Sequence, residues 1–120
     1  DLSVAYTTQV GTYMRVGNMV TVNASLVLST FTHTTASGHL QITGLPFTAK
    51  TVSGQQHHGT IRFEGFTLAH YTHFTTQVSS NSSTVLISAS KTAAGAVLLT
   101  TAEFTTGSSV RIYFTLTYQV

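Results

Sequence analysis

The chain has 120 residues and an unusually low content of charged side chains. Five basic and three acidic residues make up 7% of it, whereas charged residues make up about 25% of an ordinary domain. Five dispersed cations are too few for the phosphate contacts that nucleic-acid binding requires, so we expect no nucleic-acid partner. The absence of cysteine excludes disulfides and thiolate metal sites. No apolar run approaches the length of a membrane span, so membrane insertion is not expected.

The length and composition predict one all-β domain over residues 1–120. Threonine is the most frequent residue, and branched and aromatic side chains fit a pleated, half-buried surface. A hydrophobic content of 42% excludes general disorder. The low charge leaves little repulsion between copies, which favours a homo-oligomer.

The predicted elements begin with a β-hairpin. Apolar residues recur with a period of two from Val20 to Leu28, while Thr21, Asn23 and Ser25 point the other way. The dipeptide Gly17-Asn18 suits a tight turn. It separates strands predicted at Thr12–Val16 and Met19–Ser29.

The middle of the chain predicts shorter strands. His39–Thr43 ends before Pro46, which cannot donate to a ladder, and Phe47–Val52 is a possible edge strand. Ser53–Gln56 is predicted to be a loop. Thr60–Glu64 and Phe66–Gln77 both alternate, and the slip of their apolar phase at Gly65 predicts a bulge or sharp bend.

The last third predicts a polar turn followed by three strands. The turn is Ser79–Ser83, and a further loop is expected at Thr92–Gly95. The strands are Val85–Ser90, Val97–Glu103 and the clearly alternating Val110–Gln119. Eight or nine strands spaced near ten residues predict an antiparallel β-sandwich of jelly-roll type, or a barrel.

Three stretches together resemble the C-terminal domains of bacteriophage tail fibres and tailspikes. They are residues 6–18 (YTTQVGTYMRVGN), 42–47 (ITGLPF) and 104–118 (FTTGSSVRIYFTLTY). Their order and spacing cover nearly the whole chain. The shared motifs are a turn, a corner and a core strand, so they indicate scaffold, and no binding residue is carried over from the family.

The resemblance implies a C-terminal fragment of a longer protein, placed on the virion at the tip of a fibre or spike. It implies a homotrimer that follows an upstream shaft and binds a host receptor. That receptor is usually a surface glycan such as lipopolysaccharide or capsule, and sometimes an outer-membrane protein. A structural trimerisation cap without a ligand is the alternative. A carbohydrate-active enzyme and a cellular adhesin also remain open.

The six histidines do not predict a metal site within one chain. His57 and His58 are adjacent, and His70 and His73 are three residues apart, so on a strand each pair points to opposite faces. One histidine on a trimer axis would present three imidazoles, which leaves an axial metal as an alternative. The expected cofactor is none.

The acidic residues give little support to catalysis. Glu64 and Glu103 are the internal carboxylates, and a glycosidase needs such a pair about 5–10 Å apart. We expect each to pair instead with Arg62 or Arg111. A serine triad is disfavoured because Asp1 is the single aspartate and no nucleophile-elbow motif is present. The sequence predicts a protein that is not an enzyme.

Non-covalent sugar recognition fits the residues better. Aromatic rings pack against the apolar faces of a sugar, and polar side chains bind its hydroxyls. The alternation suggests that Tyr71 and His73 face outward, as do Arg111 and Tyr113. The predicted ligand-binding residues are His57, His58, Arg62, Tyr71, His73, Arg111 and Tyr113.

Overall fold

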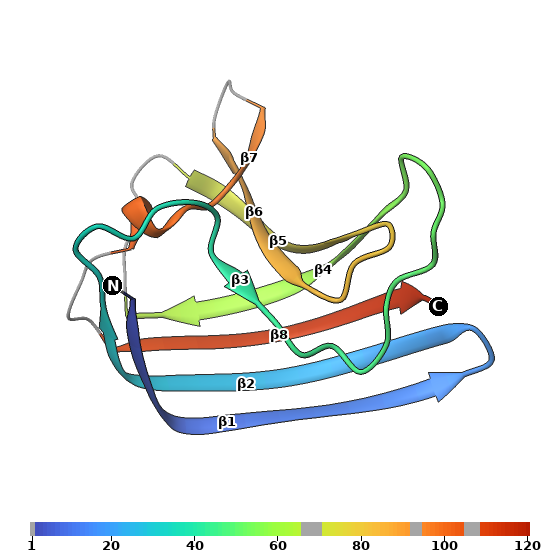
Figure 1. Ribbon diagram of the computed structural model, residues 1–120, viewed down its shortest axis with the longest axis horizontal. Coiled ribbons are helices and arrows are strands. Elements are labelled where there is room, and N and C mark those ends of the chain that lie inside the picture. Colours follow the sequence, from blue (N-terminus) through green and yellow to red (C-terminus); the bar gives the residue numbers. More distant parts are fainter. Residues whose placement is uncertain (1, 66–70, 92–94, 105–108) are drawn as a thin grey trace.

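Over the residues that the structure describes, the protein is an antiparallel β-sandwich with one short 3-10 helix (Figure 1). The computed structural model describes residues 2–65, 71–91, 95–104 and 109–120. The prediction of an all-β antiparallel sandwich with eight or nine strands is confirmed, with eight strands in this part of the chain. No helix in these ranges is both long and apolar enough to span a membrane. The elements are β1 Ser3–Val16, β2 Met19–Thr32, β3 Gln41–Ile42, β4 Gln56–Glu64, β5 Tyr71–Ser79, β6 Val85–Lys91, β7 Ala96–Leu98, η1 Thr101–Glu103 and β8 Val110–Gln119.

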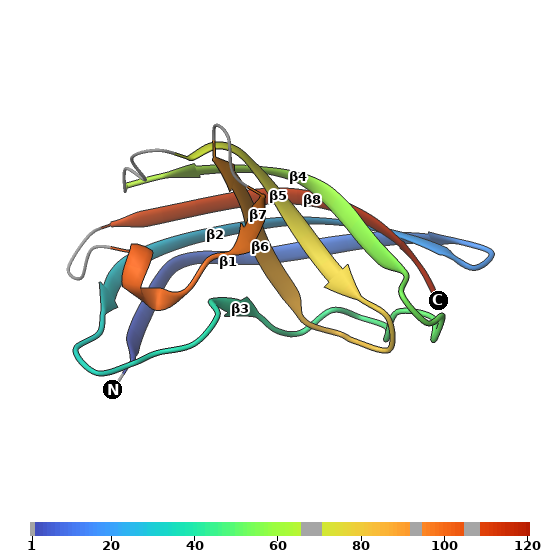
Figure 2. The ribbon, with the colours of Figure 1, turned by 90° about the horizontal axis from the view of Figure 1, so that it is seen from above.

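The two layers of the sandwich are parts of one curled sheet. The strand order is β1-β2-β8-β4-β5-β6-β3, and β7 pairs with β6. In Figures 1 and 2, β1, β2, β8 and β4 form one layer, and β5 and β6 cross it obliquely. β4 belongs to both layers because Thr60–Glu64 pair with β8 while Gln56–Thr60 pair with β5. The core lies between the layers.

Strand alternation fills the core as the sequence predicts. In β8, Val110, Ile112, Phe114, Leu116 and Tyr118 are buried. The residues between them face the outer side of the sheet. The apolar residues of β2 and β6 meet them from neighbouring strands and from the opposite layer. Most of the buried surface therefore comes from the regularly alternating strands.

The predicted β1–β2 hairpin is confirmed, but β1 begins nine residues earlier than Thr12. Gly17 takes a positive φ of 58° in the two-residue turn. Among the described strands, β1 is the edge of the sheet and is bonded on one side, to β2. Most of its side chains are exposed along the whole strand, and Thr12–Val16 is predicted from its place before the Gly17-Asn18 turn.

Three of the shorter strands differ from the predictions. His39–Thr43 is reduced to β3, because His39 makes an isolated bridge to Thr100 outside the ladder. Phe47–Val52 is not a strand, since its amides bond to separate segments, such as Ala49 N–H to the Ser82 carbonyl. Val97–Glu103 is split into β7 and η1.

The bend predicted at Gly65 is confirmed, and the residue has a φ of 99° there. β5 begins at Tyr71. The first residues of the predicted strand Phe66–Gln77 lie outside the described ranges, as does most of the predicted loop Thr92–Gly95. The predicted turn at Ser79–Ser83 is present between β5 and β6.

Three stretches of the chain, residues 6–18, 42–47 and 104–118, meet at Phe47. The Tyr13 ring contacts the Phe47 ring edge-on at 5.6 Å, and the Arg15 guanidinium lies 4.9 Å from its centroid. The Tyr118 hydroxyl donates to the Phe47 carbonyl at 2.9 Å. Burial raises the pKa of Tyr118, and hydrogen bonding to the Phe47 backbone offsets this in part. These motifs therefore join the hairpin, the corner and β8 into one scaffold.

Candidate functional site

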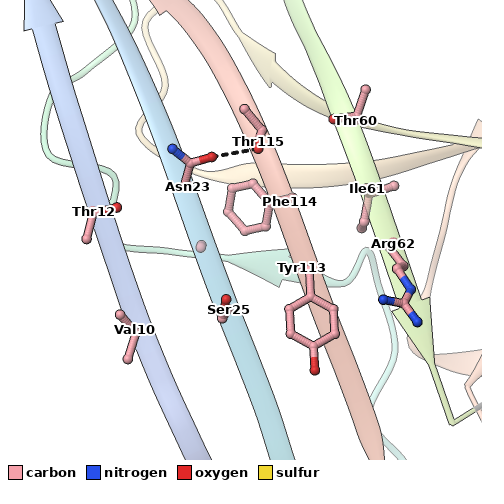
Figure 3. A pocket seen from close by; sticks show the side chains of 11 residues that line it. Val10, Thr12, Asn23, Ser25, Thr60, Ile61, Arg62, Tyr113, Phe114 and Thr115 are labelled. Atoms are coloured by element: carbon pink, nitrogen blue, oxygen red, sulfur yellow. Dashed lines mark hydrogen bonds between the residues drawn. The ribbon is translucent and has the colours of Figure 1, made fainter.

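The outer face of the β1-β2-β8-β4 layer carries a hollow of about 400 Å³ (Figure 3). We call it the outer-face trough. It lies where neighbouring strands place small side chains, such as Ala24 and Ser25, between larger ones. Its lining consists of Val10, Thr12, Asn23, Ala24, Ser25, Thr60, Ile61, Arg62, Tyr113, Phe114 and Thr115.

Tyr113 and Arg62 lie side by side at one end of the trough. They are direct cross-strand neighbours in the β4–β8 ladder, and the Arg62 guanidinium carbon lies 6.0 Å from the centre of the Tyr113 ring. Arg62 forms an ion pair with Glu64, and Arg111 Nη1 lies 3.5 Å from the other oxygen of the same carboxylate. Exposed ion pairs add little stability, but this one orients a guanidinium beside an aromatic ring.

Asn23 and Thr115 supply polar groups further along the trough. The Thr115 hydroxyl donates to Asn23 Oδ1 at 2.7 Å. This bond occupies the amide oxygen and leaves the N–H groups of the exposed Asn23 side chain as donors for a ligand. Thr12, Ser25 and Thr60 add hydroxyls around them. The trough can therefore contact a ligand through one ring, one guanidinium, one amide and several hydroxyls.

The structure brings three of the predicted binding residues together. Arg62 and Tyr113 line the trough, and Arg111 is joined to them through Glu64. His58 lies on the same face of β4 as Thr60 and Arg62, outside the lining. Their outward orientation agrees with the sequence alternation, and their role in binding stays a prediction.

His57 points to the inner side of β4, away from the trough, and its role in binding stays a prediction. Its Nε2 atom is buried and has no hydrogen-bond partner. It alternates with the exposed His58, as neighbouring residues on a strand must.

Tyr71 and His73 lie on β5, in the other layer. The expectation that Tyr71 faces outward is wrong: its ring packs 6.2 Å from the Phe74 ring and lies beneath the Lys91 ammonium. The irregular β5–β6 register between Tyr71 and His73 changes the side-chain phase. His73 is exposed as expected, and His70 lies outside the described residues.

The sequence analysis missed Asn23, Thr60 and Thr115 as candidate ligand contacts. Alternation does place Asn23 on the outward face of its strand. The missing information is the strand order, which sets Asn23 beside Thr115, 92 residues away. Nothing local in the sequence indicates that β2, β8 and β4 are adjacent.

Glu64 and Glu103 are held by different partners. The predicted pairing of Glu64 with Arg62 and Arg111 is confirmed. Glu103 instead accepts hydrogen bonds from Thr100, from the backbone N–H at 2.7 Å and from the hydroxyl at 2.6 Å. Neither carboxylate lines the trough. Its lining therefore offers hydrogen bonds and a ring surface without a pair of acids.

A second hollow of about 430 Å³ lies between β1, β2 and the segment Ile42–Pro46. Its lining is mainly aliphatic and aromatic, with residues such as Leu26, Leu45 and Phe114. It lacks the combination of guanidinium and amide that the trough offers, so the trough is the better candidate for a polar ligand. Within the described ranges, no three side chains of His, Asp or Glu are grouped to hold a metal ion.

Comparison with known proteins yields no relative: no protein-family model, curated protein or solved structure matches the chain.

Proposed function

We propose that the chain is the receptor-binding domain of a bacteriophage tail fibre or tailspike and binds a bacterial surface glycan in the outer-face trough. The ligand class is lipopolysaccharide or capsule, and the domain acts as a homotrimer at the fibre tip without catalysing a reaction. One observation carries this proposal: the trough combines the Tyr113 ring, the Arg62 guanidinium and the Asn23 amide in a hollow of about 400 Å³.

The chemistry of the trough matches that of a sugar. The C–H faces of a pyranose pack on an aromatic ring, and its hydroxyls pair with amides, guanidinium groups and other hydroxyls. Because the lining contains no carboxylate, it suits retention of the glycan better than its hydrolysis.

The sequence supports the same function independently of the trough. The stretches 6–18, 42–47 and 104–118 resemble tail-fibre and tailspike C-terminal domains, and they build the junction around Phe47. This junction supports the hairpin and β8, two of the elements that form the trough.

The test is binding of the purified domain to intact bacteria and to their extracted glycans. We expect the domain to stain some strains and to lose staining on glycan-deficient mutants. Tyr113→Ala should weaken binding about fivefold, because an aromatic contact contributes about 1 kcal/mol. Tyr6→Ala is the matched control, since Tyr6 is 46% exposed and lies outside the trough. Equal binding by both variants would remove the trough as the site.

A structural trimerisation cap is the second candidate function. It is favoured by the exposed apolar residues of the β1–β2 hairpin, which suit contacts between copies. An oligomer that binds none of the bacteria or glycans would support the cap.

A further inference from the structure

An apolar stripe runs along the outer face of the β1–β2 hairpin. It consists of Val10, Met14, Val16 and Met19, whose side chains are 54%, 66%, 71% and 44% exposed. We call it the hairpin stripe. The β1–β2 register places Val16 opposite Met19 and Val10 opposite Ser25, so the stripe lies on the same face as the trough.

The stripe carries no charge. Arg15 is the one charged residue between Ser3 and Thr32, and alternation turns it to the opposite face of β1. There its Nε donates to the Gly17 carbonyl at 2.9 Å and its guanidinium lies over Phe47. The outward face of the hairpin is therefore apolar, with threonine, serine and asparagine between the larger residues.

The free edge of β1 adds a second reason for a covering partner. β1 is a 14-residue strand bonded on one side. Long edges in monomeric proteins are normally protected by lysine, proline or a covering segment. β1 contains neither lysine nor proline. Bulges also protect edges, but the two register shifts of β1 lie between Ala5 and Thr8, outside the stripe.

These features fit another copy of the same chain. Residues close to a rotation axis meet their own counterparts on the other copies, so a charged stripe placed at the axis would repel itself. An uncharged stripe avoids this cost, and methionine adapts its shape to the facing surface. A partner of opposite charge would find no counter-charge on this face of the hairpin.

We propose that the hairpin stripe lies close to the three-fold axis of the homotrimer and forms the contact between copies there, and that the adjacent copy walls the trough on its β1 side. The second part follows from Val10, which belongs to both the stripe and the trough lining. This inference rests on the proposed function, because it assigns a partner to the same site. The ligand would then lie at the boundary between two chains.

The first test is molecular mass by light scattering without any glycan. The wild-type domain should be an oligomer, and Met14→Glu and Val16→Glu should be monomers because the copies would bring like charges together. Val52→Glu is the matched control, since Val52 is an exposed apolar residue outside the hairpin, and it should keep the wild-type mass. A monomeric wild type, or glutamate variants of unchanged mass, would overturn the proposal.

A second test does not depend on how the glutamate variants fold. The chain has no cysteine, so a single introduced thiol reports on one position. Val16→Cys should form disulfide-linked pairs of chains under mild oxidation, while Val52→Cys should not. Equal cross-linking of the two variants would contradict a contact at the stripe.

The two proposals fail in different ways. A monomer that still stains bacteria through Tyr113 would retain the receptor function and remove the stripe as an interface. An oligomer that dissociates with Val16→Glu but binds no glycan would retain the interface and remove the receptor function.

Discussion

Glu103 accepts two hydrogen bonds from a single threonine at the start of η1. Burial alone would raise the pKa of this carboxyl, but the Thr100 bonds and the nearby Lys91 ammonium outweigh it and hold the pKa below the ordinary 4.5. The folded protein therefore favours the carboxylate. Its contribution to stability is present above the unfolded pKa and is lost as the pH falls through the folded value.

Glu103→Gln should weaken the dependence of the free energy of unfolding on pH in the acidic range. We expect the variant to be less stable than wild type near neutral pH, and the difference to shrink at pH values below 4.5. Urea unfolding across this pH range measures the effect. Thr100→Val removes the hydroxyl bond to Glu103 and keeps the backbone bond. It should therefore remove part of the pH-dependent stabilisation that Glu103 provides. If the free energy of unfolding of wild type and Glu103→Gln changed equally with pH, this account would be contradicted.

At the scale of elements, Gly59 allows β4 to pass between two neighbours. A Cβ atom at this position would overlap the Thr115 carbonyl oxygen, and it would lie 2.7 Å from Thr76 Oγ1 and 3.0 Å from Leu116 Cα. Gly59 lies where β4 leaves β8 and continues with β5. The curl of the sheet therefore depends on a residue without a side chain.

Gly59→Ala should destabilise the domain by about 2–4 kcal/mol, since backbone must move to admit one methyl group. Gly11→Ala is the control, because its Cβ would meet only the Asn23 carbonyl oxygen, at 4.0 Å. Thermal unfolding followed by circular dichroism compares them. Equal melting temperatures would show that β4 can shift without cost.

The sequence predicted elements well where one face of a strand is buried. β2 and β8 alternate between core and surface, so their positions and outward residues, including Tyr113, follow from a period of two. β1 is exposed along most of its length. The Gly17-Asn18 turn located its second half, and its first half was missed. η1 was predicted as strand because Val97 and Leu99 alternate up to the point where the backbone turns.

The trough was predicted only in part because it depends on pairing between distant strands. Arg62, Arg111 and Tyr113 were identified by residue type and orientation. Asn23 and Thr115 become partners only after β8 is placed between β2 and β4. Tyr71 was misplaced because a local irregularity in register reverses the phase of a strand.

At the scale of the whole molecule, the low charge should make glycan binding nearly independent of salt. Two arginines share Glu64 at the end of the trough, which leaves about one uncompensated charge. We expect a change of no more than a few-fold between low and high salt. Binding to extracted glycan at several salt concentrations measures it, and Glu64→Gln should steepen the dependence. A steep loss for the wild type would count against a neutral ligand.

The position of β8 also has a consequence for the order of folding. This strand is the last of the eight to be synthesised, yet it occupies the centre of its layer, between β2 and β4. Until it emerges, the β1–β2 hairpin and β4 each present an unpaired ladder edge and an uncovered apolar face. Its ten-residue register with β2 joins residues that lie 82 to 100 positions apart in the sequence, and such contacts form slowly. The nascent chain therefore exposes apolar surface and unpaired strand edges until β8 has been synthesised.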